Sequence, residues 1–273
     1  MRITVIIVAI LSFSISAVLT NADWAWVNNL GSPPNSTAWE FQGSVDDDGD
    51  KLFFIRDDGK IYVTEKNGSS WSIPVALPSQ INNPGATYPF WDDDNNRLYF
   101  VSGSNIYYST WLGGNNWSER TSVGSDINTS DQERAPVVAG DYLYFSREGI
   151  IYVAFKSGST WTDSQATGIG SGYASSYHNG YLYFYDNRGG GQGGTDCWKA
   201  QGSETSFNAP VNLGPEINTY ANDGSPTWTS DGKYLFFYSN RSGGHGAVDL
   251  YWARYTETAV EATSLGQVKA LFR

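Results

Sequence analysis

Apolar and polar positions along this chain alternate in short runs, and one run recurs. A leucine is followed by two aromatic residues, and a charged or glycine-containing turn precedes it. The five copies have their leucines at Leu52, Leu98, Leu143, Leu182 and Leu235, which are 46, 45, 39 and 53 residues apart. Short runs rich in aromatic and β-branched residues indicate strands. The pattern therefore predicts a repeat protein made of strands.

The first four copies contain three more short runs of the same kind, and the fifth contains two. A second run follows the leucine run, as in Lys60–Val63 and Asp249–Trp252. A turn of Gly, Ser and Asn then leads to an aromatic residue that opens another strand: Trp71, Trp117, Trp161 or Phe207. A further strand comes before each leucine run, as in Ser225–Trp228. Four strands in about 40–45 residues are typical of a propeller blade, so we expect an all-β, five-bladed β-propeller.

The fifth copy lacks its last strand, and the N-terminus supplies a match for it. The segment Trp24–Gly31 aligns without a gap with Phe207–Gly214. We therefore expect the N-terminal strand, Trp24–Leu30, to join the last blade and close the ring over residues 23–255. Closure removes the open sheet edges that would otherwise promote aggregation.

The segment Ser225–Arg241, with Asp249-Leu250-Tyr251 after it, resembles the repeat of the TolB-type, WD-repeat-like β-propellers. The resemblance covers about 230 residues as a repeat and implies a fold rather than an activity, because such propellers serve many functions. It also implies two ion pairs, Arg188–Asp196 and Arg241–Asp249. Each would stiffen a glycine-rich loop between the second and third strands of its blade.

The two ends of the chain depart from the repeat. Met1-Arg2 is followed by an apolar run from Ile3 to Leu19 and by Thr20-Asn21-Ala22. This order predicts a signal peptide over residues 1–22, with an uncleaved membrane anchor as the alternative. We expect a secreted protein, extracellular or periplasmic, that has no membrane insertion after cleavage. Residues 256–273 form a C-terminal tail with a predicted short amphipathic helix.

Composition and charge narrow the function classes. The chain of 273 residues is 15% aromatic and 16% charged, which excludes a disordered chain. Its net charge of −11 argues against nucleic-acid partners, since phosphate contacts need Lys and Arg. The single cysteine, Cys197, cannot form an intramolecular disulfide. We expect a monomer without cofactors.

Three carboxylates occupy one repeat position: Glu40, Glu133 and Asp223. Each comes just before the innermost strand of its blade, where strand starts surround the mouth of the central channel. Such a ring could bind a ligand there, or perform acid–base chemistry on a glycosidic bond. It could equally be a latch between blades, in which each carboxylate accepts backbone N–H groups.

Other candidate ligand-binding residues are Trp39, which breaks the repeat, Arg188 and Arg241 in the glycine-rich loops, and His245. Aromatic faces beside polar side chains are typical of carbohydrate sites. The aspartate runs that begin at Asp46 and Asp92 align with hairpin turns and lack the glycine of a calcium loop. Neither histidine has a second ligand at metal-binding spacing, so we expect no metal.

These observations support three functions. The first is non-catalytic binding of a glycan or a protein ligand at the channel mouth. The second is a glycoside hydrolase or lyase that uses Glu40, Glu133 and Asp223. The third is a structural interaction protein of the cell envelope.

Overall fold

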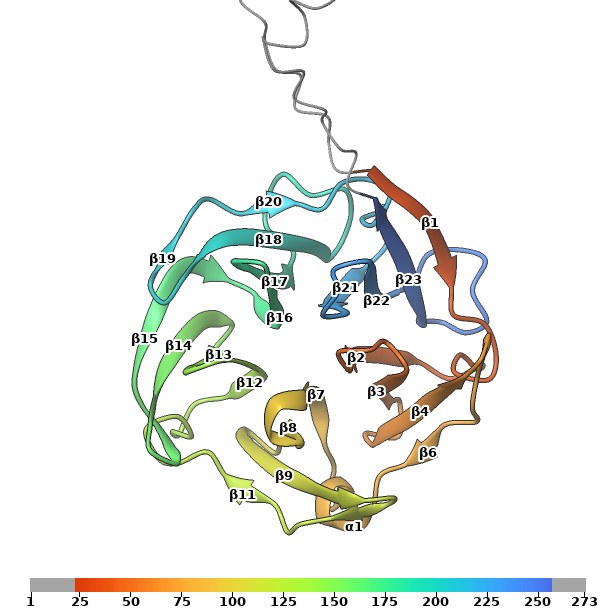
Figure 1. The fold of residues 1–273 in the computed structure, drawn as a ribbon. Helices are drawn as coiled ribbons and strands as arrows, with labels where there is room; N and C mark the ends of the chain where they lie inside the picture. The colour runs from red at the N-terminus through yellow and green to blue at the C-terminus, as the bar shows by residue number, and fades with distance from the viewer. Residues whose placement is uncertain (1–22, 257–273) are drawn as a thin grey trace, which may run out of the picture. The chain divides into compact units, whose positions relative to one another are not determined.

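A computed structural model describes residues 23–256, in which five small antiparallel sheets surround a central axis (Figure 1). The predicted five-bladed β-propeller is therefore confirmed. The signal peptide predicted over residues 1–22 and the helix predicted in the C-terminal tail lie outside the described residues.

Each blade runs from an inner strand at the channel to one or two outer strands, which are short in blades 1, 2 and 4. Blade 1 consists of β2 (Glu40–Val45), β3 (Lys51–Arg56), β4 (Ile61–Asn67), β5 (Ser70–Trp71) and β6 (Val75–Ala76). Blade 2 consists of β7 (Thr87–Asp92), β8 (Arg97–Ser102), β9 (Asn105–Gly113), β10 (Asn116–Trp117) and β11 (Thr121–Ser122). A helical turn, α1 (Ser79–Asn82), precedes β7, and a 3-10 turn, η1 (Asp93–Asn95), follows it.

The other blades repeat this order. Blade 3 consists of β12 (Glu133–Ala139), β13 (Tyr142–Arg147), β14 (Ile150–Ser157) and β15 (Thr160–Ser171). Blade 4 consists of β16 (Tyr173–His178), β17 (Tyr181–Asp186), β18 (Asp196–Ser203), β19 (Ser206–Phe207) and β20 (Val211–Asn212). Blade 5 consists of β21 (Asp223–Trp228), β22 (Tyr234–Ser239), β23 (Asp249–Thr256) and β1 (Asp23–Asn29).

The N-terminal strand closes the ring, as the sequence predicts. β1 pairs with β23 and forms the outer edge of blade 5 (Figure 1). The Trp24 ring lies 5.4 Å from that of Trp228 and 5.3 Å from that of Tyr255, and its indole N–H donates to the Leu213 carbonyl at 3.1 Å. The first and last strands of residues 23–256 thus share one sheet, so the ring opens only if this sheet separates.

The second strand of each blade carries the core. All five repeat leucines are fully buried, because each such strand is covered by a blade on either side. Aromatic rings fill the seams: Tyr144 of blade 3 stacks on Tyr177 of blade 4 at 5.6 Å with an angle of 8°. Most of the recurring aromatic residues therefore serve packing between blades.

A β-bulge interrupts each inner strand near its start. The pairing register shifts there in all five blades. Four residues at or beside the shift have a positive φ of 51–54°, in the left-handed region: Gln42, Tyr88, Ala135 and Ser225. Bulges re-aim side chains, and these four lie on the strands that face the channel.

The aspartate runs form turns. The Asp46 carboxylate accepts the backbone N–H groups of Asp50 and Lys51, both at 2.9 Å, and Asp92 caps η1. Within residues 23–256, no cluster of three or more His, Cys, Asp and Glu side chains could hold a metal ion. Over the same residues, no helix has the length and apolarity to cross a membrane.

Candidate functional site

The three repeat carboxylates lie at the starts of β2, β12 and β21, and all three are fully buried. Each forms an ion pair with an arginine of its own blade. The pairs are Glu40–Arg56 at 3.0 Å, Glu133–Arg147 at 3.1 Å and Asp223–Arg241 at 2.7 Å. A buried carboxylate is stable when paired and hydrogen-bonded, and these are both.

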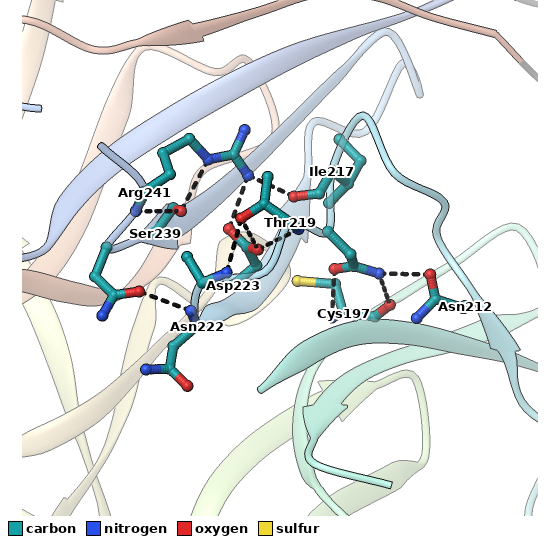
Figure 2. Close-up of polar contacts among 11 residues, drawn as sticks. Cys197, Asn212, Ile217, Thr219, Asn222, Asp223, Ser239 and Arg241 are labelled. Atoms are coloured by element: carbon teal, nitrogen blue, oxygen red, sulfur yellow. Dashed lines mark hydrogen bonds and ion pairs between the residues drawn. The ribbon is translucent and has the colours of Figure 1, made fainter. Parts of the chain in front are cut away.

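The blade 5 pair shows what the carboxylate holds (Figure 2). Asp223 accepts the N–H of Thr219 at 2.6 Å and its hydroxyl at 2.9 Å, while Arg241 also donates to the carbonyl of Ile217. In blade 1, Glu40 accepts the N–H and the hydroxyl of Ser36 in the same way. In blade 3, Glu133 accepts the N–H and the hydroxyl of Thr129. The three acids therefore fasten the loop that enters each inner strand. The acids accept backbone N–H groups as the predicted latch does, but these groups belong to the loop that enters the acid's own blade and not to the neighbouring blade.

Asparagines one residue before those hydroxyls connect neighbouring blades. Asn218 accepts the N–H of Cys197 at 2.7 Å and donates to its carbonyl at 2.8 Å. The same two-way bond joins Asn35 to Leu250, Asn82 to Ile61 and Asn128 to Ile106. Sequence analysis missed these residues. For three of them the signal is an Asn-Ser/Thr pair that ends four residues before the acid, whereas Asn82 is followed by Asn83 and its blade has Ala86 in place of the acid.

The predicted ion pairs Arg188–Asp196 and Arg241–Asp249 are wrong. Arg188 pairs with Asp186 at 2.8 Å, and Arg241 pairs with Asp223. Each of the two loop carboxylates instead accepts loop N–H groups, such as that of Gln192 on Asp196 and that of His245 on Asp249, both at 2.6 Å. A loop that wraps its N–H groups around a carboxylate needs no cation there. It does need glycine, since a Cβ on Gly191 would lie 1.8 Å from the Asp196 carboxylate.

Trp39 and His245 lie at the seam of blades 5 and 1. Trp39 is 51% exposed and forms an isolated bridge with Val248, in the loop that carries the exposed His245. Arg188 and Arg241 are mostly buried by their partners. Of the sequence-predicted ligand-binding residues, only Trp39 and His245 are therefore open to solvent.

A cluster that the sequence did not predict spans the mouth of the channel. The rings of Tyr88 in blade 2 and Tyr173 in blade 4 stack at 5.9 Å. These blades are not adjacent, so the contact runs across the channel. Arg134 of blade 3 lies near both phenols and interacts with them electrostatically.

More rings continue this cluster around the axis. Tyr173 contacts Tyr185 at 5.4 Å, Tyr185 contacts Tyr238 at 5.8 Å, and Tyr238 contacts Phe41 at 6.4 Å. A Cβ on Gly224 would lie 2.5 Å from the Tyr238 ring, so only glycine allows this ring to lie against β21. We call these residues the tyrosine cluster: Phe41, Tyr88, Arg134, Tyr173, Tyr185 and Tyr238.

The tyrosine cluster is a set of neutral donors and aromatic faces around one arginine. Burial raises the pKa of Tyr88, Tyr185 and Tyr238, so their phenols stay protonated at neutral pH. Tyr185 is buried, whereas the other members are half-buried at the mouth. The cluster contains no carboxylate. It can therefore stack against a ring and donate hydrogen bonds, but it holds no acid–base pair.

The sequence does contain a signal for this cluster. The position three residues after the repeat leucine holds Ile55, Val101 and Ser146 in blades 1 to 3. In blades 4 and 5 it holds Tyr185 and Tyr238. The repeat fills this position with a smaller side chain in the other three blades. Packing within the repeat therefore does not explain the two tyrosines, and they mark a candidate site.

Comparison with known proteins supports the fold alone. No protein-family model matches the chain, and no curated protein matches it in sequence. Among solved structures, it is similar to a gluconolactonase from Xanthomonas campestris, with 10% identity and a TM-score of 0.50 over 84% of this chain and 89% of that one. It is also similar to an exo-β-1,3-galactanase from Clostridium thermocellum, with 12% identity and a TM-score of 0.52 over 83% of this chain and 62% of that one.

Proposed function

We propose that this protein is a non-catalytic binding propeller that holds a glycan at the tyrosine cluster. The observation that carries the proposal is the ring of half-buried aromatic side chains that meet across the channel mouth with Arg134 among them. Aromatic faces suit the apolar face of a sugar, and phenol and guanidinium groups suit its hydroxyls. The exposed Trp39 lies two residues before Phe41 of this cluster and offers a further aromatic face.

The burial of the acids supports binding rather than hydrolysis. Most glycoside hydrolases use two carboxyl groups that flank the scissile bond. Glu40, Glu133 and Asp223 are fully buried and each is neutralised by an arginine. A hydrolase or lyase that uses these three residues would have to break the latches that fasten its own blades.

Other parts of the proposal come from the sequence. We propose that the protein is exported and monomeric, without a cofactor or a nucleic-acid partner. Its repeat would be related to those of the TolB-type propellers, on the strength of Ser225–Arg241.

A glycan array combined with a reducing-sugar assay on mixed polysaccharides tests the function. The substitution Arg134→Met removes the guanidinium group from the tyrosine cluster. Glycan binding should weaken at least about tenfold, because at least one charge-assisted hydrogen bond to the glycan is lost. The matched control is Arg120→Met, because Arg120 is also half-buried against a tyrosine but lies in an outer segment. The control should bind as wild type does.

Two results would contradict the proposal. The first is an array on which the wild type binds no glycan. The second is a release of reducing sugar that Glu133→Gln abolishes, since the residue would then act on substrate.

A further inference from the structure

Three seams between blades contain a cleft at the same four repeat positions. Between blades 5 and 1 these positions hold Tyr234, Phe236, Trp252 and Trp71. Between blades 1 and 2 they hold Lys51, Phe53, Val63 and Trp117. Between blades 2 and 3 they hold Arg97, Tyr99, Tyr108 and Trp161. Because the backbone repeats, the clefts differ through their side chains.

Cations cover the aromatic faces in two of these clefts. Lys51 Nζ lies 4.6 Å from the ring centroid of Trp111, and the cleft of blades 1 and 2 is reduced to about 30 Å³. The cleft of blades 2 and 3 measures about 190 Å³, but its Arg97 lies 4.5 Å from the ring of Tyr108. The cleft of blades 5 and 1 has Tyr234 at that position and measures about 240 Å³.

Aromatic rings form the walls of this third cleft, which we call the seam cleft. Trp71 of blade 1 meets Phe236 of blade 5 at 6.2 Å and 89°. Tyr234 meets Trp252 at 5.7 Å and 64°. Trp71, Tyr234 and Trp252 are only half-buried, so their rings keep faces that a ligand can reach.

Polar side chains line the edge of the seam cleft. Asp48 supplies a carboxylate, Ser69 a hydroxyl and Lys66 an ammonium group. The Lys66 ammonium group lies 3.7 Å from the Asp50 carboxylate, so it is already paired and does not favour an anionic ligand. A neutral ligand rich in hydroxyl groups uses both the donors and the acceptors.

The seam cleft has a fixed frame. Ser230 of blade 5 donates its N–H and its hydroxyl to the carbonyl of Asp47 in blade 1, at 3.0 and 3.1 Å. These bonds tie two hairpin turns across the seam. The walls are thus in place before a ligand arrives, which lowers the entropic cost of binding.

We propose that the seam cleft binds a single neutral pyranose residue. Its volume is below the roughly 300–1,000 Å³ of sites for drug-sized ligands, so it suits one ring. Asp48 lies beyond the far end of β2 from Glu40, so the seam cleft lies toward the face opposite the tyrosine cluster. It is a second site and does not rest on the proposed function of the channel mouth.

The test is a titration with methyl α- and β-glycosides of glucose, galactose, mannose and N-acetylglucosamine, followed by tryptophan fluorescence and ligand-observed NMR. A binding free energy of about 0.3 kcal/mol per non-hydrogen atom corresponds, for a methyl glycoside, to a Kd of about 1 mM. Trp252→Val installs the residue that blade 1 carries at this position, Val63, and should weaken binding at least about tenfold by removing a stacking face. Tyr108→Val in the cleft of blades 2 and 3, and Arg134→Met, should leave the affinity unchanged.

A second variant tests the seam cleft even if Trp252→Val does not fold. Asp48→Ala alters an exposed turn and should weaken binding severalfold through lost hydrogen bonds. The proposal is overturned if no glycoside in the panel binds at roughly ten times the expected Kd. It is also overturned if binding survives both seam-cleft variants, or is lost only in Arg134→Met, which would assign the sugar to the tyrosine cluster.

Discussion

Replacing Arg147 with methionine isolates the structural role of the buried acids. Glu133 is fully buried and the Arg147 side chain is only 14% exposed, so little solvent screens their contact at 3.1 Å. Removing one partner of a buried pair leaves an uncompensated charge, which costs about 3–5 kcal/mol. For a chain of this size, the Tm should then fall by about 6–20 °C.

A double variant shows whether the cost arises from the unpaired charge. Glu133→Gln keeps an oxygen that accepts from Thr129, and combined with Arg147→Met it leaves no charge in the latch. The double variant should therefore recover part of the stability that Arg147→Met loses. The control is Lys233→Met, which breaks the exposed Lys233–Asp231 pair and should leave the Tm unchanged.

Urea and thermal unfolding, followed by tryptophan fluorescence, measure these effects. An Arg147→Met variant that unfolds at the wild-type midpoint would refute the latch. So would a Glu133→Gln variant that keeps its stability but loses an enzymatic activity, because a reacting carboxylate need not support the fold.

Three further predictions concern other features of the fold. Burial lowers the pKa of His178 below its ordinary 6.5, so the unfolded chain binds more protons and stability falls as the pH drops below that value. His178→Phe keeps an aromatic ring against Trp228 and should reduce the dependence of unfolding free energy on pH, as urea titrations from acidic to neutral pH would measure. An unchanged pH dependence would show that His178 does not cause it. Gly191→Ala places a methyl group against a carboxylate and should speed proteolytic cleavage of its loop, whereas Gly189→Ala, which meets no atom within 4 Å, should not; equal cleavage of both would count against the wrapped loop. Trp24→Ala removes ring contacts from the closing strand and should cost about 2–4 kcal/mol in urea unfolding, and a loss near zero would show that closure contributes little.

The sequence predicts most of the fold because a propeller is a local repeat. Each blade is one run of short strands joined by tight turns, so a leucine such as Leu98 marks the same strand in every copy. Ring closure is predictable for the same reason, since Trp24–Gly31 carries the pattern of a missing outer strand. The same alignment places Glu40 and its equivalents at one strand position.

The partners of those side chains are less accessible to sequence reasoning. Arg241 and Asp249 are close along the chain, yet Arg241 pairs with Asp223 from the neighbouring strand. The wrapped loop that satisfies Asp249 depends on backbone N–H groups, which the residue types do not reveal. A charged pair in sequence is thus a weak guide wherever the backbone can supply the hydrogen bonds.

By itself, the sequence determines the number of blades, the closing strand and the repeat positions of the acids, since these follow from short-range patterns. Only the tertiary structure decides that the acids are buried and that the tyrosine cluster forms. Tyr88 and Tyr173 come from blades that are not neighbours, and they meet only because the closed ring brings every inner strand to one axis. The same holds for the seam cleft, where Trp71 packs against Phe236 because the first and last blades meet. Contacts of this kind arise from ring geometry, because the residues that meet are far apart along the chain.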